Sequence, residues 1–183
     1  ARVSGNYVGT DATGTTSVPN RTGIDVGVAT GTVIGVSGEG VSDELQRNVV
    51  SGNEGDGISL WSTSNNRISG NYIGLDSSGM VALPNGERGI VLSGGANANV
   101  IGFVSTAGPG KALLGNVIAG HNHPTLGGGI ELNGQMSDNR IAGNLIGTDK
   151  TGKTAIPNLF GIKLRFGAAR NLIGTDGDGV DDA

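Results

Sequence analysis

The feature that most constrains the fold of this chain is an internal repeat. The segment NRIAGNLIGTDKTGKTAIPNLFGIKL at 139–164 recurs as NRISGNYIGLDSSGMVALPNGERGIVL at 66–92 and as ARVSGNYVGTDATGTTSVPNRTGIDV at 1–26. A second unit alternates with it, as NVVSGNEGDGISL at 48–60 and NVIAGHNHPTLGGGIEL at 116–132. Because self-similarity at a fixed period indicates stacked units, residues 1–183 are predicted to form a single segment, built as a two-unit repeat starting near residues 1, 66 and 139.

Each unit contains three short apolar segments separated by Gly and Asn, which predicts strand, bend, strand. In the Gly-Ile-x-apolar segments the apolar residues alternate, so both members of the pair face one side. The residues expected to point inward are Val3, Ile34, Ile68, Ile101, Ile141 and Ile173 in the first segment type; Val8, Val50, Ile73, Ile118 and Ile146 in the second; and Ile24/Val26, Ile58/Leu60, Ile90/Leu92, Ile130/Leu132 and Ile162/Leu164 in the third.

No such unit can bury its apolar face alone, so the units must stack, with each strand pairing in parallel with its equivalent one coil away. The predicted fold class is therefore all-β: a single-stranded parallel β-helix of about five coils, ~24 Å long at the usual strand spacing, with three short strands per coil and Asn/Gly corners.

The composition agrees with a thin-layered core. Of the 183 residues, 36 are Gly and only 3% are aromatic, so the core must come from Val, Ile and Leu. Acidic and basic residues are interspersed at a net charge of -4, which gives no broad basic surface for nucleic acid. No apolar run approaches the length of a membrane-spanning segment.

The sequence pattern NxIxGN…GIxL…NxIG resembles the right-handed parallel β-helix repeats of the pectin-lyase-like superfamily. It is similar in particular to the long NVISGN…GI arrays of bacterial extracellular and surface proteins. The resemblance covers nearly the whole chain and implies right-handed coiling and an extracellular or cell-surface location. It implies no single activity, because this superfamily holds lyases, hydrolases, adhesins and filament proteins alike.

One polar position recurs at the same corner of every predicted coil. Stacked Asn side chains can hydrogen-bond to one another and to the backbone, so we assign this corner a structural role. The corner residues are Asn6, Asn48, Asn71, Asn116 and Asn144.

Aspartates gather in the C-terminal stretch TDGDGVDDA, as Asp176, Asp178, Asp181 and Asp182. Several carboxylates on a Gly-containing loop suit Ca²⁺, so this stretch is a candidate calcium site, with a solvated acidic loop as the alternative.

Three other aspartates, Asp11, Asp76 and Asp149, occupy equivalent places in the long units. Each is followed by Thr or Ser and Gly, which predicts an Asx-type turn rather than a metal ligand. The loops that continue from these turns are expected to fold back over an apolar stripe on the outward side of the second segment type, because a stripe of this length is unfavourable when exposed to water. That stripe consists of Tyr7, Val49, Tyr72, Val117 and Leu145.

Arginines recur at every second coil on the outward side of the first segment type, as Arg2, Arg67 and Arg140. At ~10 Å spacing they match an anionic polymer such as an acidic polysaccharide. Alternatively they lie along the surface and pair with nearby Asp or Glu.

Residues suited to catalysis are poorly aligned. Glycosidases place two carboxylates roughly 5–9.5 Å apart. Asp25 and Glu131, in the outward column of the third segment type, are ~14 Å apart, and Glu131 is expected to pair with Lys163. The lyases that this fold resembles set an acidic calcium cluster beside Lys or Arg, but no such cluster accompanies Lys163 and Arg165. His121 and His123 could share a metal, but no further ligand is near them in sequence, so they are expected to be exposed loop residues.

The sequence favours a non-catalytic extracellular structural or adhesive module, such as a surface protein or filament subunit. Both chain ends fall inside a repeat, which predicts neighbouring coils of a longer chain or self-association through the open ends of the solenoid. The alternatives are a lyase, hydrolase or epimerase acting on an acidic polysaccharide, or a glycan-binding module without chemistry.

Overall fold

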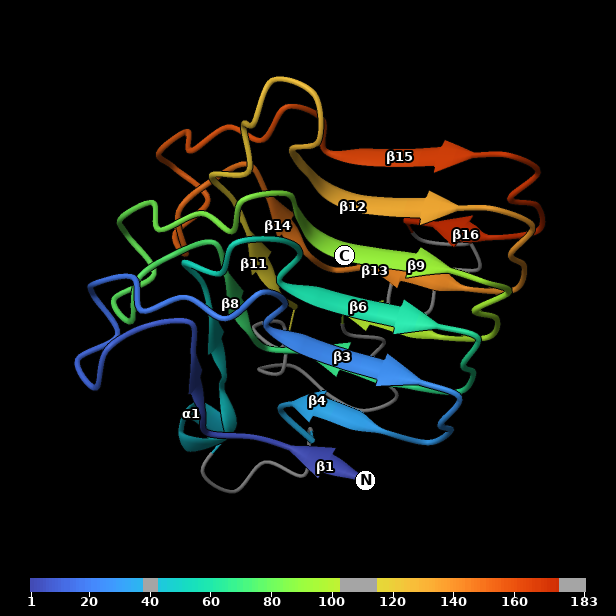
Figure 1. Cartoon of the computed structure of the whole chain (residues 1–183), viewed down its shortest axis with the longest axis horizontal. Helices are drawn as coiled ribbons and strands as arrows, with labels where there is room; N and C mark the ends of the chain where they lie inside the picture. The colour runs from blue at the N-terminus through green and yellow to red at the C-terminus, as the bar shows by residue number, and fades with distance from the viewer. Residues whose placement is uncertain (38–42, 103–114, 175–183) are drawn as a thin grey trace.

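The computed structural model describes residues 1–37, 43–102 and 115–174, and in them sixteen short strands and one helical turn, α1 (Asp43–Gln46), follow one another (Figure 1). Every pairing between these strands is parallel and joins a strand to its equivalent one coil away. The chain thus forms the predicted parallel β-helix, with five complete coils followed by the first strand of a sixth.

The strands stack into three sheets, which we number in chain order. Sheet 1 contains β1 (Arg2–Val3), β4 (Val33–Gly35), β7 (Arg67–Ser69), β10 (Val100–Gly102), β13 (Arg140–Ala142) and β16 (Leu172–Ile173). Sheet 2 contains β2 (Tyr7–Val8), β5 (Val49–Val50), β8 (Tyr72–Ile73), β11 (Val117–Ile118) and β14 (Leu145–Ile146). Sheet 3 contains β3 (Ile24–Gly27), β6 (Ile58–Trp61), β9 (Arg88–Ser93), β12 (Gly128–Asn133) and β15 (Ile162–Arg165).

The core runs along the axis of the solenoid as stacked columns of Ile, Leu and Val. The alternation predicted from the sequence places these side chains inside, and in the middle coils they are fully buried. Ala96 and Met136, from the corners between sheets 3 and 1, complete it. Two expected core residues, Leu164 and Ile173, are instead 43% and 41% exposed, because β15 and β16 are the last strands of their sheets.

Side-chain amides stack at all three corners. At the corner between sheets 1 and 2, the Nδ2 groups of four successive Asn residues each donate to the Oδ1 of the next coil's Asn at 2.9 to 3.0 Å, and these donors are Asn6, Asn48, Asn71 and Asn116. From the second coil on, Nδ2 also donates to a backbone carbonyl of the preceding coil, as Asn71 does to Ile34. This ladder consists of Asn6, Asn48, Asn71, Asn116 and Asn144.

Two further ladders stand at the other corners. Between sheets 3 and 1 the rungs are Thr32, Asn66, Asn99, Asn139 and Asn171. Between sheets 2 and 3 they are Asn20, Asn53, Asn85, His121 and Asn158. Buried amides paired in this way satisfy their own polar groups and link each coil to the next.

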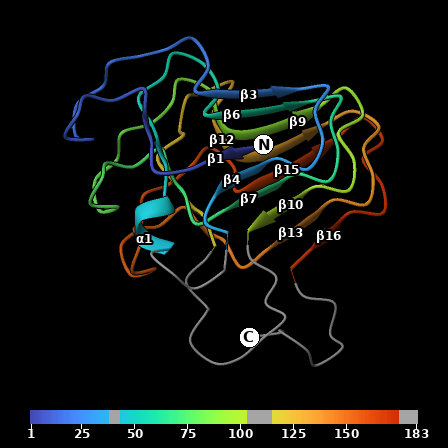
Figure 2. The same cartoon turned by 90° about the horizontal axis from the view of Figure 1, so that it is seen from below.

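Long loops cover the outward face of sheet 2. They lie before the start of the sheet 3 strands, whereas the tight corners that lead into sheet 1 lie beyond the ends of these strands (Figure 2). Val49, Tyr72 and Val117 are buried there with Leu75 and Ala119. The prediction that these loops cover the apolar stripe is therefore confirmed in the middle coils, whereas Tyr7 and Leu145 in the end coils stay exposed. Among the described residues, no helix is long and apolar enough to cross a membrane.

Loops of alternate coils also bond to one another. The backbone N–H of Ser77 donates to the carbonyl of Gly14, and that of Lys150 donates to Gly79, both at 2.9 Å. Gly79 has a φ of +69°, and a β-carbon there would lie 2.7 Å from the ring of Tyr72. The loop can therefore close over this ring only with glycine at that position.

Candidate functional site

The outward face of sheet 3 carries the largest group of charged side chains that contact one another in the described part of the chain. Register places Asp25, Ser59, Val91, Glu131 and Lys163 in one column, as the repeat predicts. The first residues of β9 and β12 form a second column, in which Arg88 pairs in register with Gly128.

Arg88 is the centre of this group. Its Nε donates to Oδ1 of Asp56 at 2.8 Å and its Nη2 donates to Oε2 of Glu87 at 2.6 Å. Its Nη1 lies 3.8 Å from Oε2 of Glu131, whose other oxygen is 3.4 Å from Nη1 of Arg165. A continuous chain of charged contacts therefore spans four neighbouring coils.

The expected ion pair between Glu131 and Lys163 is wrong. The two residues are in register, but the Nζ of Lys163 lies 4.7 Å from the ring centroid of Phe160. Arg165 follows two residues later on the same side of β15, and its longer side chain reaches the carboxylate instead.

Burial governs the electrostatics of this network. It raises the pKa of Asp56, and the hydrogen bond and positive charge of Arg88 oppose the effect. Burial alone would lower the pKa of Arg88, but the bonds and charges of Asp56, Glu87 and Glu131 outweigh it and raise that pKa. The arginine and the carboxylates thus stabilise one another in their charged forms.

The arrangement does not match a pair of catalytic carboxylates. Asp56 and Glu131 stand two coils apart, ~10 Å along the axis, and the guanidinium of Arg88 contacts both. A general acid and a nucleophile or base must both face the substrate, whereas these two carboxylates face a shared arginine. Sequence reasoning missed Asp56, Glu87 and Arg88, although their places just before or at the start of a Gly-Ile segment were a usable signal.

The arginines predicted to form a column lie on the outward face of sheet 1. Arg2, Arg67 and Arg140 pair in register with Val33 and Val100 between them. Arg2 donates from Nη2 to Oε1 of Gln46, and Arg67 donates from Nη2 to the carbonyl of Val36 at 2.7 Å. For these two arginines the hydrogen-bond partners are neutral oxygens rather than the expected Asp or Glu.

The proposed calcium ligands Asp176, Asp178, Asp181 and Asp182 lie outside the described residues. Within 1–37, 43–102 and 115–174, no group of three or more His, Cys, Asp or Glu side chains could hold a metal ion.

The three loop aspartates close Asx-type turns, as predicted. In the first loop, Oδ1 of Asp11 accepts from the backbone N–H groups of Thr15 and Thr16 and from the hydroxyl of Thr13. Asp76 and Asp149 repeat this pattern in the third and fifth coils. Hydrogen bonds from Thr13 and from Thr151 are the main causes that lower the pKa of Asp11 and of Asp149.

The prediction that His121 is an exposed loop residue is wrong, whereas His123 is exposed as expected. His121 is fully buried and replaces Asn in the ladder between sheets 2 and 3, with Nδ1 3.1 Å from Oδ1 of Asn158 and Nε2 3.1 Å from Nδ2 of Asn85. Burial lowers its pKa to about 4, against the opposing hydrogen bond of Asn158.

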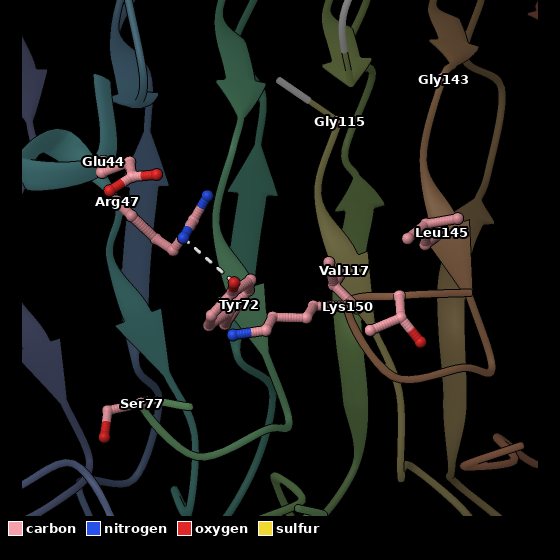
Figure 3. A pocket seen from close by; sticks show the side chains of 10 residues that line it. Glu44, Arg47, Tyr72, Ser77, Gly115, Val117, Gly143, Leu145 and Lys150 are labelled. Carbon is pink, nitrogen blue, oxygen red and sulfur yellow. Dashed lines mark hydrogen bonds between the residues drawn. The ribbon is translucent and has the colours of Figure 1, made fainter. Parts of the chain in front are cut away.

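An open pocket of about 420 Å³ lies beside the loops over sheet 2 (Figure 3). The guanidinium of Arg47 stacks 4.3 Å from the ring centroid of Tyr72, and its Nη1 donates to the hydroxyl of that tyrosine at 3.0 Å. Lys150 extends toward the same ring, and Val117 and Leu145 supply apolar surface. Another pocket, of about 380 Å³, is lined by Arg21, Thr22, Glu54, Gly55, Asp56 and Glu87.

No protein-family model, no curated protein and no solved structure matches this chain. A functional assignment therefore depends on the chemistry of the described residues.

Proposed function

We propose that this chain is an extracellular structural or adhesive module, of the pectin-lyase-like β-helix type, that belongs to a surface protein or filament and performs no catalysis. The observation that carries the proposal is the use of the polar side chains. Glu131 contacts two arginines, His121 is a rung of a ladder, and Asp149 closes a turn. Groups suited to acid–base chemistry thus hold neighbouring coils or turns together.

A mechanical role follows from these contacts. Each coil is joined to the next by parallel strand pairs in three sheets and by a side-chain rung at each corner. Pulling or bending the rod must break these bonds in parallel, so the array suits a stiff spacer or stalk. The exposed Leu164 and Ile173 favour contact with further coils, from the same chain or from a second copy.

Two measurements test the proposal together. Antibodies against the purified chain should label intact, unpermeabilised cells of the source organism, and the label should disappear after brief treatment of the cells with protease. The purified chain should release neither reducing ends nor unsaturated products from pectate, alginate or hyaluronate. Turnover that is lost in both Arg88→Ala and Glu131→Gln but kept in Glu54→Gln, a change of an exposed carboxylate, would contradict the non-catalytic assignment.

A second candidate function is binding or processing of an acidic polysaccharide along sheet 1. It is favoured by one observation, the regular recurrence of Arg2, Arg67 and Arg140 on every second strand of this sheet. Arg67→Ala should then weaken binding to a polyuronate, whereas Val33→Thr on the neighbouring strand should not. Equal retention of wild type and Arg67→Ala on a pectate column would exclude this function.

A further inference from the structure

The corner that follows sheet 3 carries strain that no visible packing offsets. The residue directly after each sheet 3 strand has a positive φ: Val28 at 51°, Ser62 at 50°, Gly94 at 60°, Gly134 at 131° and Phe166 at 54°. Glycine suits this backbone, whereas a β-branched or aromatic residue is a genuine outlier there. Val28 and Phe166 are nevertheless 73% and 68% exposed, so neither side chain gains much from packing.

A third apolar side chain is exposed at the same corner. Trp61, the last residue of β6, is 52% exposed. A β-carbon on Gly94 would lie 2.6 Å from its Nε1, and one on Gly27 would lie 3.6 Å from its Cε3. Glycines of the two neighbouring coils therefore flank the indole ring, so that it lies against their backbone while half of its surface stays open to solvent.

The two rings stand on one edge of the solenoid, one residue out of register, because Trp61 aligns with Arg165 and Phe166 follows Arg165. Strands β6 and β15 end at the same edge of sheet 3 (Figure 1), three coils apart, which separates Trp61 and Phe166 by ~14 Å along the axis. In the coils between them, the half-buried Ser93 and Asn133 lie in register with Trp61, and Gly94, Gly95 and Gly134 follow these two residues. A β-carbon on Gly95 or Gly134 would meet no atom within 4 Å, so nothing projects between the rings at those positions.

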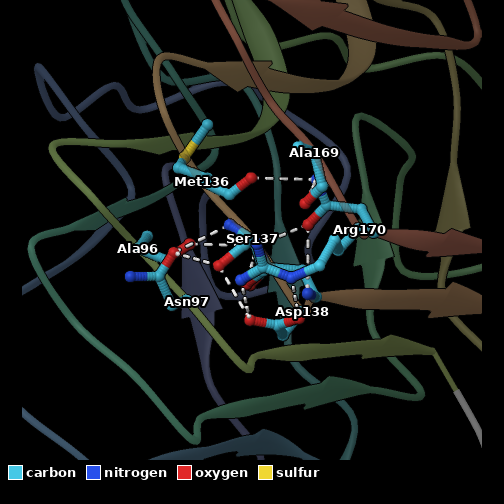
Figure 4. A network of polar contacts seen from close by, with 9 residues as sticks. Ala96, Asn97, Met136, Ser137, Asp138, Ala169 and Arg170 are labelled. Atoms are coloured by element: carbon cyan, nitrogen blue, oxygen red, sulfur yellow. Dashed lines mark hydrogen bonds and ion pairs between the residues drawn. The ribbon is translucent and has the colours of Figure 1, made fainter.

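The charged groups near this edge are already paired. The guanidinium of Arg165 lies 4.7 Å from the ring centroid of Phe166 and contacts Glu131. Arg170 and Asp138 form a two-bond ion pair at 3.0 and 3.1 Å, joined by Ser137 and, through Ser137, by Asn97 (Figure 4). Arg170 lowers the pKa of Asp138, which keeps this carboxylate charged and paired.

We propose that this edge is a binding site for an extended neutral polysaccharide, which lies along the solenoid axis and stacks on Trp61 and Phe166. Exposed aromatic faces bind the C–H faces of pyranose rings, and the open backbone between them can meet hydroxyl groups. A protein partner would instead favour one contiguous apolar patch. Within the described residues, the charges that border the two rings are paired with one another, which disfavours a polyanion there. The proposal rests on the adhesive role proposed above and identifies its ligand class.

The single tryptophan of the chain makes this edge directly observable. Trp61 emission should shift and saturate on titration of wild-type protein with at least one of cellohexaose, xylohexaose or mannohexaose, and not with hexagalacturonate. Calorimetry with the same oligosaccharide should show affinity falling at least about tenfold in Trp61→Ala and in Phe166→Gly, as expected for loss of a stacking ring. Tyr7→Ala, which removes an exposed ring from sheet 2, should leave affinity unchanged.

Phe166→Gly separates binding from folding. It should raise the melting temperature because glycine relieves the strained φ, and yet it should weaken binding. The proposal is overturned if none of the three neutral hexasaccharides gives saturable binding, if only hexagalacturonate binds, or if Trp61→Ala and Phe166→Gly bind as wild type does. Such a failure, together with surface labelling and no turnover, would leave the structural module standing without this ligand.

Discussion

Replacing His121 by Asn should make the stability of the protein much less sensitive to mild acid. The amide of Asn85 is oriented by the ladder, because its Oδ1 accepts from Asn53 and its Nδ2 therefore faces Nε2 of His121. The single proton of the neutral ring then lies on Nδ1 and is donated to Asn158. Protonating Nε2 would set a second donor against the Asn85 amide and break the rung.

The size of the effect follows from the depressed pKa. Burial lowers the pKa of His121 from 6.5 to about 4 in the folded protein. Between these values the unfolded chain binds more protons than the folded one, so the free energy of unfolding falls as the pH falls. At ~1.4 kcal/mol per pH unit, the loss reaches ~3 kcal/mol by pH 4 and vanishes above pH 7. Asparagine does not titrate, so His121→Asn removes this loss.

The variant should also be no less stable than wild type at neutral pH. In this ladder the Nδ2 of Asn85 and of Asn158 each donates to a carbonyl of the preceding coil, Val50 and Ile118 respectively. Histidine has no second donor for this purpose, and Asn at position 121 supplies one for the equivalent carbonyl of Ile73, with a net contribution of ~1 kcal/mol.

The assay is urea unfolding followed by circular dichroism between pH 4.5 and 7.5 at constant ionic strength. The difference in unfolding free energy between His121→Asn and wild type should grow by ~2.5 kcal/mol from the upper to the lower pH, and His123→Asn, at an exposed ring, should follow wild type. Parallel pH profiles for wild type and His121→Asn would refute the reasoning, because they would show that the ladder tolerates the imidazolium.

Three further predictions concern stability and are checked by the same unfolding assay at pH 7. Asn71→Ala should lower the free energy of unfolding by ~2–3 kcal/mol, because buried partners on both neighbouring coils lose their hydrogen bonds. Asn6→Ala, at the exposed end of that ladder, should lower it by ~1 kcal/mol or less, and equal losses would show that burial of the ladder is irrelevant. Ala98→Gly should stabilise by ~1 kcal/mol because Ala98 has a φ of 53°, and a loss would show that this strain is absent. Glu131→Gln should lower the free energy of unfolding by ~2–3 kcal/mol, because the buried carboxylate of Glu131 contacts two arginines. The control Glu54→Gln, at an exposed carboxylate, should lower it by less than ~0.5 kcal/mol. No change in Glu131→Gln would mean that the charged network does not stabilise the fold.

The fold was predictable because one physical rule repeats without interruption. Apolar residues with period two, spaced by Gly and Asn at each corner, have only one way to be buried, which is to stack on equivalent residues. The columns headed by Ile34 and Ile58 follow this rule through the middle coils. The rule fails at Leu164 and Ile173, since burial also needs a neighbour on both sides and the last strands of a sheet have one.

The ladder containing His121 was missed because its rungs are not uniform in type. Asn20, Asn85 and Asn158 each follow a proline, whereas Asn53 and His121 follow Ser-Gly and Ala-Gly. Aligning VVSGN with VIAGH places His121 on Asn53, and this alignment alone indicates a buried rung. The type of residue, which suggested an exposed loop histidine, was less informative than its place in the repeat.

The charged network on sheet 3 was missed for a geometric reason. The repeat locates backbone positions, and it correctly aligned Glu131 with Lys163. It does not say how far a side chain reaches, and Arg165 reaches Glu131 from two residues along the strand, while Arg88 reaches it from the neighbouring coil. Long flexible side chains choose partners by reach and burial, which one column of residues does not show.

Strain separates the structural corners from the candidate binding edge. Ala98, Asp138 and Arg170 also adopt positive φ without being glycine. Each directly precedes a ladder asparagine, and the rung that follows, such as Asn99 N–H to Oδ1 of Asn139 at 2.9 Å, gives that strain a compensating bond. Val28 and Phe166 directly precede no rung and remain exposed, so no ladder bond compensates their strain. Backbone strain that folding does not offset is the kind that function maintains, and for this reason we place the contact with polysaccharide at this edge rather than along the ladders.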